Sequence, residues 1–147
     1  VDATLIEHNH KWFLFFGENQ TALDILNLWL SDSPFGEFKP HPKTPIVMSP
    51  KNARMGGSVL KRDGRLLRFG QNNAAEYGES LCVLEVNKLT PTDYLETLIG
   101  SVRIDSYKGP HSINFDQHST KMLLDYYTNE FSLFAGVRRL KARFSKQ

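Results

Sequence analysis

The sequence predicts an all-β fold, and three observations lead to this class. Three segments have the pattern strand, two-residue turn, strand; these segments recur at a constant spacing; and a further strand-like run follows the first two of them. The chain has 147 residues, of which 40% are hydrophobic and 23% are charged. This size and composition are sufficient for a buried core and are typical of a globular domain.

The three predicted hairpins cover residues 4–16, 58–69 and 112–124. Their turns fall at Asn9-His10, at Asp63-Gly64 and at Gln117-His118. Asp-Gly is a strong hairpin signal because both central positions of the favoured turn need a positive φ, whereas Asn-His and Gln-His fit this geometry less well. Residue 9 to residue 63 is 54 residues, and residue 63 to residue 117 is again 54, so the hairpins form an internal repeat.

A third strand is predicted after each of the first two hairpins, at residues 23–31 and 80–86. Residues 22–30 (ALDILNLWL) also have the i, i+3, i+4 spacing of an amphipathic helix, but their place in the repeat favours the strand. Turn-rich stretches follow at residues 31–45 and 87–94. One repeat therefore contains a hairpin, a third strand and an irregular or edge segment, which is the make-up of a four-stranded blade.

A repeat of about 50 residues with several strands is typical of a β-propeller, a ring that closes with roughly four to eight blades. The 147 residues hold about 2.7 repeats, too few to close a ring. The sequence therefore predicts about three blades, the C-terminal part of a larger propeller, over residues 1–137, and a basic tail at 138–147. Val1, in place of methionine, indicates a processed start or a piece of a longer chain. Duplicated hairpins in a β-sandwich are the alternative.

Charge and hydropathy exclude two classes of partner. The net charge is +2, much of the basic excess lies in the last ten residues, and the body of the chain is close to neutral. A nucleic-acid-binding domain would carry a basic face along its fold, so nucleic acid is not an expected partner. The longest apolar run, WFLFF, is far shorter than the roughly 18 to 20 residues of a membrane span, so no transmembrane segment is expected.

The basic tail has an amphipathic pattern, with Val137, Leu140 and Phe144 on one side and basic residues between them. Such a segment either docks on the fold or binds a membrane surface or an acidic partner. The single cysteine, Cys82, lies in the apolar run SLCVLEV and is expected to be a buried, unreactive thiol. One thiol forms no internal disulfide, and it favours a reducing, cytoplasmic compartment.

No metal site and no cofactor site are predicted. His8 and His10 have the spacing of two imidazoles on one strand face, but they fall in a predicted surface turn and no third ligand lies near them in sequence. Neither a phosphate-binding loop nor a Gly-x-Ser-x-Gly elbow occurs.

The repeat also predicts where polar side chains meet, because residues at the same position in successive blades face the central axis of a propeller. Asp2, Gly56 and Pro110 each lie seven residues before a predicted turn. The polar residues at or beside these positions, together with those after the middle hairpin, are the candidate site: Asp2, Arg54, Gln71, Tyr77, His111 and Asn114. Short polar groups and an aromatic ring are typical of a site for a polyhydroxylated ligand such as a sugar.

Each main candidate also has a structural interpretation. Asp2 is either a pocket carboxylate or a solvated chain start, Arg54 either a pocket cation or half of an ion pair between blades, and His111 either a ligand contact or a hydrogen-bonded structural residue. Cleavage of a glycosidic bond needs two carboxylates, and Asp2 alone has the axial position. Pairing it with Glu76, Glu79 or Asp105 has no support in the spacing, so this chain is expected to lack a complete acid–base pair.

Four segments together resemble a known family: VDATLIEHNHKWFLFF, LWLSDSPFGEFKPHPKTPIV, ARMGGSVLKRDGRLLRFGQNNAAEYGESLCVLEVNKLTPTDYLE and GPHSIN. They are similar to the N-terminal domain family of glucosamine inositolphosphorylceramide transferase, over nearly the whole chain up to about Asn114. The resemblance implies a five-bladed β-propeller related to family 43 glycoside hydrolases. In bacteria, similar domains accompany formyltransferase-like or polysaccharide-biosynthesis proteins.

The same resemblance implies which residues line the pocket, namely Asp2, Arg54, Gln71, Tyr77 and His111. It places Asp2 at the opening of the third blade, and it makes acidic residues of the first two blades, which this chain does not contain, the partners of Asp2. Ala3 and Met55 depart from the family pattern, because each stands where proline is usual.

These observations support a first hypothesis of a carbohydrate-active propeller module, incomplete here, which binds a glycan or sugar-containing substrate and takes part in glycosyl hydrolysis or transfer. In it Asp2 is the candidate acid, base or pKa-tuning carboxylate, and the N-terminal remainder of the propeller is a partner. The alternative is a non-catalytic glycan-binding or scaffold propeller attached to a transferase domain. A third hypothesis is an interaction domain that completes its sheets by forming oligomers.

Overall fold

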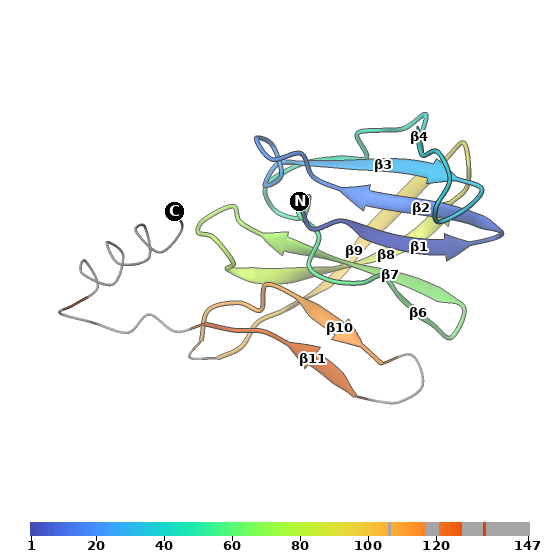
Figure 1. Ribbon diagram of the computed structural model, residues 1–147. Helices are drawn as coiled ribbons and strands as arrows, with labels where there is room; N and C mark the ends of the chain where they lie inside the picture. The colour runs from blue at the N-terminus through green and yellow to red at the C-terminus, as the bar shows by residue number, and fades with distance from the viewer. Residues whose placement is uncertain (106, 117–120, 128–133, 135–147) are drawn as a thin grey trace.

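The computed structural model describes residues 1–105, 107–116, 121–127 and 134, whose regular structure consists of antiparallel β-sheets (Figure 1). These residues contain no helix, so the predicted all-β class is confirmed for this part of the chain. The same residues contain no helix that is long and apolar enough to cross a membrane. The predicted basic tail at 138–147 lies outside the described residues.

The first sheet has the order β1 (Thr4–His8), β2 (Lys11–Phe16), β3 (Ile25–Ser31) and β4 (Lys39–Pro40), and β5 (Val47–Met48) also pairs with β3. The turn between β1 and β2 lies at Asn9 and His10, whose φ angles are 50° and 61°. Both residues adopt the left-handed conformation that this two-residue hairpin needs. The segment at 23–31, for which a helix was the alternative, forms β3, because alternate residues Leu26, Leu28 and Leu30 face one core.

The second sheet has the order β6 (Leu60–Arg62), β7 (Arg65–Asn72), β8 (Ser80–Leu89) and β9 (Tyr94–Val102). Its first turn lies at Asp63 and Gly64, with φ angles of 51° and 74°. The sequence predicted an irregular or edge segment after the third strand, and β9, a strand of 9 residues, lies at the edge of the sheet and pairs with β8 through two register shifts. Its side chains are mostly exposed, so the burial alternation that signals a strand is weak there.

A hairpin of β10 (Ile113–Phe115) and β11 (Met122–Leu124) follows, paired from Ile113 and Leu124 to Phe115 and Met122. The predicted turn at Gln117-His118 lies outside the described residues.

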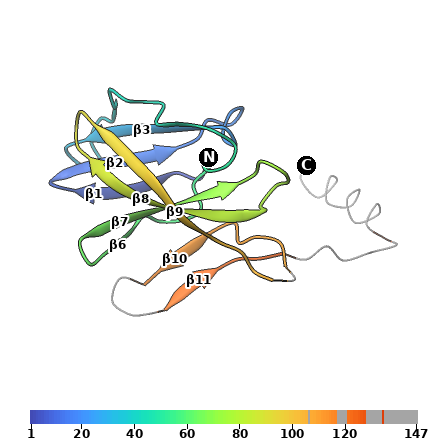
Figure 2. The same cartoon turned by 180° about the vertical axis from the view of Figure 1, so that it is seen from behind.

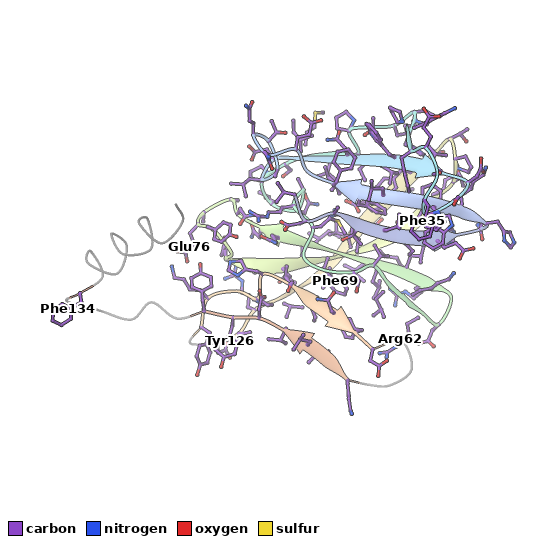
Figure 3. The ribbon with its side chains drawn as sticks, in the orientation of Figure 1. Phe35, Arg62, Phe69, Glu76, Tyr126 and Phe134 are labelled. Carbon is purple, nitrogen blue, oxygen red and sulfur yellow. The ribbon has the colours of Figure 1, made fainter. Side chains whose placement is uncertain are left out.

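The two sheets and the hairpin stack in chain order, with the second sheet in the middle; Figure 2 shows the same stack from behind. One core joins Phe13 and Leu28 of the first sheet to Leu66 and Val86 of the second. A second core joins the other face of the second sheet to β10, where Phe69 stacks on Phe115 with 5.7 Å between ring centroids (Figure 3). The second sheet is therefore buried on both faces along β7 and β8.

The face of the first sheet that points away from this core is also apolar. Leu14 lies opposite Leu5 on one side and opposite Trp29 on the other. Phe16 contacts Trp29 edge-on, with 5.4 Å between ring centroids. These side chains remain partly exposed, so the first sheet offers an apolar surface on which a further layer can stack.

Candidate functional site

A pocket of about 580 Å³ lies at the end of the stack where the three hairpins begin. Its walls come from the segments that enter β1, β6 and β10 and from the ends of β7 and β11. All six candidates line it: Asp2, Arg54, Gln71, Tyr77, His111 and Asn114. The structure thus brings together residues that are more than 100 positions apart in the sequence.

Direct hydrogen bonds hold the three entering segments together. The Thr4 hydroxyl donates to the Gly57 carbonyl over 3.1 Å, and the Ile113 amide donates to the Gly56 carbonyl over 2.8 Å. The Ser58 amide donates to Asn114 Oδ1 over 3.0 Å. Gly57 has a φ of 120°, and a Cβ atom at this position would collide with the Ile113 backbone, so the close approach requires glycine.

Asp2, Arg54 and Tyr77 form a chain of contacts along one wall. Arg54 Nε donates to Asp2 Oδ2 over 2.5 Å, and the Arg54 guanidinium lies 5.4 Å from the centre of the Tyr77 ring. The Asp2 side chain is 35% exposed and that of Arg54 is 19% exposed. The ion pair predicted as the structural interpretation of Arg54 therefore exists, and both of its members still line the pocket.

His111 lies between two tyrosine rings. Its ring is 4.8 Å from that of Tyr77 and stacks nearly parallel on Tyr127 at 4.9 Å, and the Tyr127 hydroxyl donates to the Tyr77 carbonyl over 2.7 Å. Asp125 Oδ1 accepts from the amides of His111 and Ser112 over 2.8 and 2.6 Å. The position of the imidazole is therefore set by contacts on several sides.

Gln71 is the most buried polar side chain of the pocket, at 4% exposure. Its Nε2 donates to the Met55 carbonyl over 3.0 Å, while its Oε1 has no hydrogen-bond partner in the part of the chain that the structure describes. An unpaired buried acceptor costs free energy that a donor from outside the chain would recover. Gln71 Oε1 is therefore an acceptor at the pocket wall that the described residues leave unpaired.

The acidic residues divide into two groups. Glu76 pairs with Lys108 and Glu79 with Arg103, and neither carboxylate lines the pocket, nor does Asp105. Asp125, which the sequence reasoning missed, does line it, and its side chain is 53% exposed. The register of the third hairpin was the missing signal: Ile113 pairs with Leu124, which brings Asp125 opposite Ser112. Among the described residues, two carboxylates therefore line the pocket, Asp2 and Asp125.

The described residues contain no group of three or more His, Cys, Asp or Glu side chains placed to hold a metal ion. His8 and His10 lie at the turn between β1 and β2, as the sequence predicted, and desolvation first and then the charge of Lys61 lower the pKa of His8. Cys82 is buried on β8 with its thiol 3.3 Å from the Lys51 carbonyl, and burial raises its pKa.

The fold and the pocket define an all-β domain of stacked antiparallel sheets with a polar, aromatic-lined pocket at one end of the stack. Residues 1–126 match the family described as glucosamine inositolphosphorylceramide transferase 1, N-terminal, and the chain belongs to this family. This confirms the resemblance that the four sequence segments indicated.

Three curated relatives that match the chain carry the name glucosamine inositolphosphorylceramide transferase 1. The protein from Arabidopsis thaliana is 33% identical over 121 residues, and that from Oryza sativa subsp. japonica is 30% identical over 123 residues. Each match covers 78% of this chain and 16% of the relative, so the chain spans about a sixth of the length of these proteins. No solved structure matches the chain.

Proposed function

We propose that this chain is part of a carbohydrate-active β-propeller, a glycosyl-transfer-related module, and that its pocket binds a sugar-containing ligand. The observation that carries the proposal is the pocket itself. Arg54 and Asn114 offer donors, Asp125 and the unpaired Gln71 Oε1 offer acceptors, and Tyr77 offers a ring, all within about 580 Å³. A sugar presents hydroxyl groups that both donate and accept, together with an apolar ring face, so it suits this mixture.

The relatives' names agree in chemical class with this proposal, because they contain an amino sugar and an inositol-bearing lipid. Family membership adds that the domain belongs to transferases, so sugar recognition in the pocket would serve glycosyl transfer.

The stack supports the propeller part of the proposal. A five-stranded sheet, a four-stranded sheet and a hairpin, all antiparallel, lie face to face, and their first strands begin at one common end, as the inner strands of blades do. The apolar outer face around Trp29 would pack on the preceding blade. The chain spans 16% of its relatives, so the remaining blades of a five-bladed ring would come from the N-terminal remainder of the protein.

A non-catalytic role of the propeller is the alternative, with chemistry in an attached transferase domain. The observation that favours it is that both pocket carboxylates are already engaged, Asp2 by Arg54 and Asp125 by two backbone amides. An Asp2→Asn variant of the intact protein separates the two roles. Loss of turnover in sugar transfer or hydrolysis at saturating sugar would assign acid–base chemistry to Asp2, and unchanged turnover at saturating sugar would assign a binding or scaffold role.

The binding proposal is tested on a glycan array with the intact protein and two variants. Arg54→Ala removes a pocket donor, and Arg65→Ala removes an arginine of the second sheet that is paired with Glu85 away from the pocket. We expect the wild type and Arg65→Ala to bind the same glycans, and Arg54→Ala to bind them at least tenfold more weakly. Absence of glycan binding by the wild type, or equal binding by all three, would overturn the proposal.

A further inference from the structure

We infer that a buried network of Arg68, Glu96 and Tyr94, outside the pocket, positions the pocket segment that carries Arg54. In this role the three side chains act on ligand binding through the backbone of residues 51–57. The part of the inference that concerns sugar affinity rests on the proposed function, and the part that concerns the segment does not.

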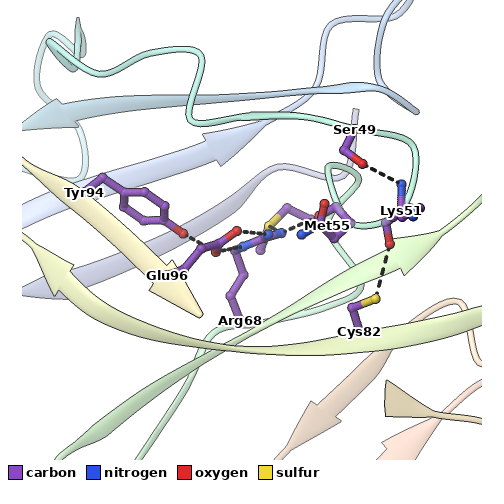
Figure 4. A network of polar contacts seen from close by, with 8 residues as sticks. Ser49, Lys51, Met55, Arg68, Cys82, Tyr94 and Glu96 are labelled. Carbon is purple, nitrogen blue, oxygen red and sulfur yellow. Dashed lines mark hydrogen bonds and ion pairs between the residues drawn. The ribbon is translucent and has the colours of Figure 1, made fainter. Parts of the chain in front are cut away.

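The network connects the outermost strand of the second sheet to its inner part (Figure 4). Arg68 on β7 is fully buried and forms a two-point ion pair with Glu96 on β9, through Nε at 2.7 Å and Nη2 at 2.6 Å. The Tyr94 hydroxyl donates to Glu96 Oε2 over 2.5 Å. Burial raises the pKa of Tyr94 well above its ordinary value, so the phenol keeps the proton that it donates.

The third nitrogen of the Arg68 guanidinium contacts the pocket segment. Its Nη1 donates to the Asn52 carbonyl over 2.9 Å and lies 3.8 Å from Met55 Sδ. The Met55 carbonyl accepts in turn from Gln71 Nε2. Arg68 is thus linked to the pocket by two routes. One runs through Met55 to Gln71, and the other runs from the Asn52 carbonyl along the segment to Arg54.

The segment is anchored to β7 and β8 nearly residue by residue. The Gln71 amide donates to the Arg54 carbonyl over 2.7 Å, the Gly56 amide to the Phe69 carbonyl over 2.8 Å, and Cys82 Sγ to the Lys51 carbonyl over 3.3 Å. Gly70 permits the approach, because a Cβ atom there would collide with the Asn52 carbonyl. A bidentate arginine fits this site because its planar fork holds Glu96 and still donates at a fixed angle to a backbone oxygen.

A buried ion pair is weak evidence for stability, since apolar residues of similar volume often serve a core equally well. A positioning role of the network can therefore be told apart from a stabilising one. Phe15 of the first sheet packs edge-on against Tyr94, at 6.1 Å between ring centroids, so the site is already lined by apolar groups that would accept an apolar replacement. The charged network supplies what such a replacement lacks, a directed hydrogen bond to Asn52.

The test uses the intact protein with two sets of substitutions. In the first, Arg68→Met, Tyr94→Phe and Glu96→Leu are combined, so that no buried charge or hydroxyl is left unpaired. In the second, Arg68→Lys keeps the positive charge beside Glu96 but removes the fork. A matched control combines Arg65→Gln and Glu85→Gln, which removes an exposed two-point arginine–glutamate pair from the same sheet.

Three readouts are compared: the thermal midpoint, peptide-resolved hydrogen exchange, and the alkylation rate of Cys82, whose thiol is covered by Lys51. We expect both Arg68 variants to raise exchange in residues 51–57 and alkylation of Cys82 by about tenfold, while exchange in β2 and β3 is unchanged. The combined variant should keep a thermal midpoint close to that of the wild type, and the control should change none of the three.

Unchanged exchange in residues 51–57 in both Arg68 variants would overturn the inference. A rise spread evenly over all sheets would overturn it as well, because it would show a merely structural role. If the wild type binds a glycan on the array, both Arg68 variants should bind it at least fivefold more weakly under conditions in which the variants remain folded. A local rise in exchange in a protein that binds no glycan would uphold the positioning role and contradict the proposed function alone.

Discussion

Arg54 Nε donates to Asp2 Oδ2 over 2.5 Å, although the two residues are 52 positions apart in the chain. They belong to the segments that enter the first and the second sheet, so this ion pair joins two layers of the stack across the pocket wall. Both side chains keep part of their surface exposed.

This exposure predicts that the ion pair contributes little to stability. In a double-mutant cycle of Asp2→Asn and Arg54→Gln, followed by urea unfolding, we expect a coupling free energy of about 1 kcal/mol or less. Glycan binding by either single variant should nevertheless fall by about tenfold, because each removes a charged group from the pocket. A coupling of several kcal/mol with unchanged binding would show that the pair serves the fold instead.

Gly57 is predicted to be irreplaceable for a steric reason. Gly57→Ala and Gly64→Ala both place an alanine at a positive φ, but a Cβ at Gly57 collides with the Ile113 backbone, whereas nothing lies within 4 Å of one at Gly64. We expect Gly64→Ala to lower the free energy of unfolding by about 1 kcal/mol and Gly57→Ala by about 3 kcal/mol or more. Equal losses in denaturant titrations of the two variants would contradict the close contact between the segment and β10.

Gln71→Met is predicted to uncouple stability from binding. The substitution removes the unpaired Oε1, which relieves a cost of about 1–3 kcal/mol, but it also removes the hydrogen bond to the Met55 carbonyl. The free energy of unfolding should therefore change by less than about 1 kcal/mol, while glycan affinity falls by about tenfold. Calorimetry and the array measure the two quantities, and a large stability loss with intact binding would assign Gln71 to the core.

The burial of Cys82 predicts that the stability of the fold depends on pH. Burial raises the pKa of the Cys82 thiol above the ordinary value of 9.0, so the folded state favours the protonated form. The resulting stability is fully present below pH 9.0 and is lost as the pH rises through the folded-state pKa. Alkylation of Cys82 by iodoacetamide in the native protein should stay slow up to pH 9.0. In the urea-unfolded protein the alkylation rate should rise with a midpoint near pH 9.0. A native midpoint below that of the unfolded protein would contradict the burial.

Much of the fold could be predicted from local signals. The dipeptide Asp63-Gly64 and the alternation of Leu26, Leu28 and Leu30 depend on neighbouring residues alone. The strand β9 could not be predicted in this way, because an exposed edge strand has no burial alternation and takes its conformation from pairing with β8.

The residues of the candidate site likewise divide into those that the sequence could predict and those that it could not. Asp2, Arg54 and His111 were found because they lie at or beside equivalent positions of the repeat, and the structure brings them to one pocket. Asp125 and Tyr127 reach His111 through the register of the last hairpin, which the unclear turn at Gln117-His118 left open in the sequence. The buried network of Arg68 was invisible for a different reason, since a charged residue in a strand ordinarily indicates an exposed face.

The burial of the second sheet on both faces has a consequence for how the sequence can change. Along β7, Leu66 faces one core and Phe69 the other, so neither set of alternate positions is free to become polar. Inserting or deleting a single residue between them would exchange the two sets and send Arg68 into the cluster around Phe69 and Ile113. Length changes should therefore accumulate in exposed loops such as the one around Phe35 and be absent from β7, a pattern that gene sequences of the family would display as a strand of invariant length.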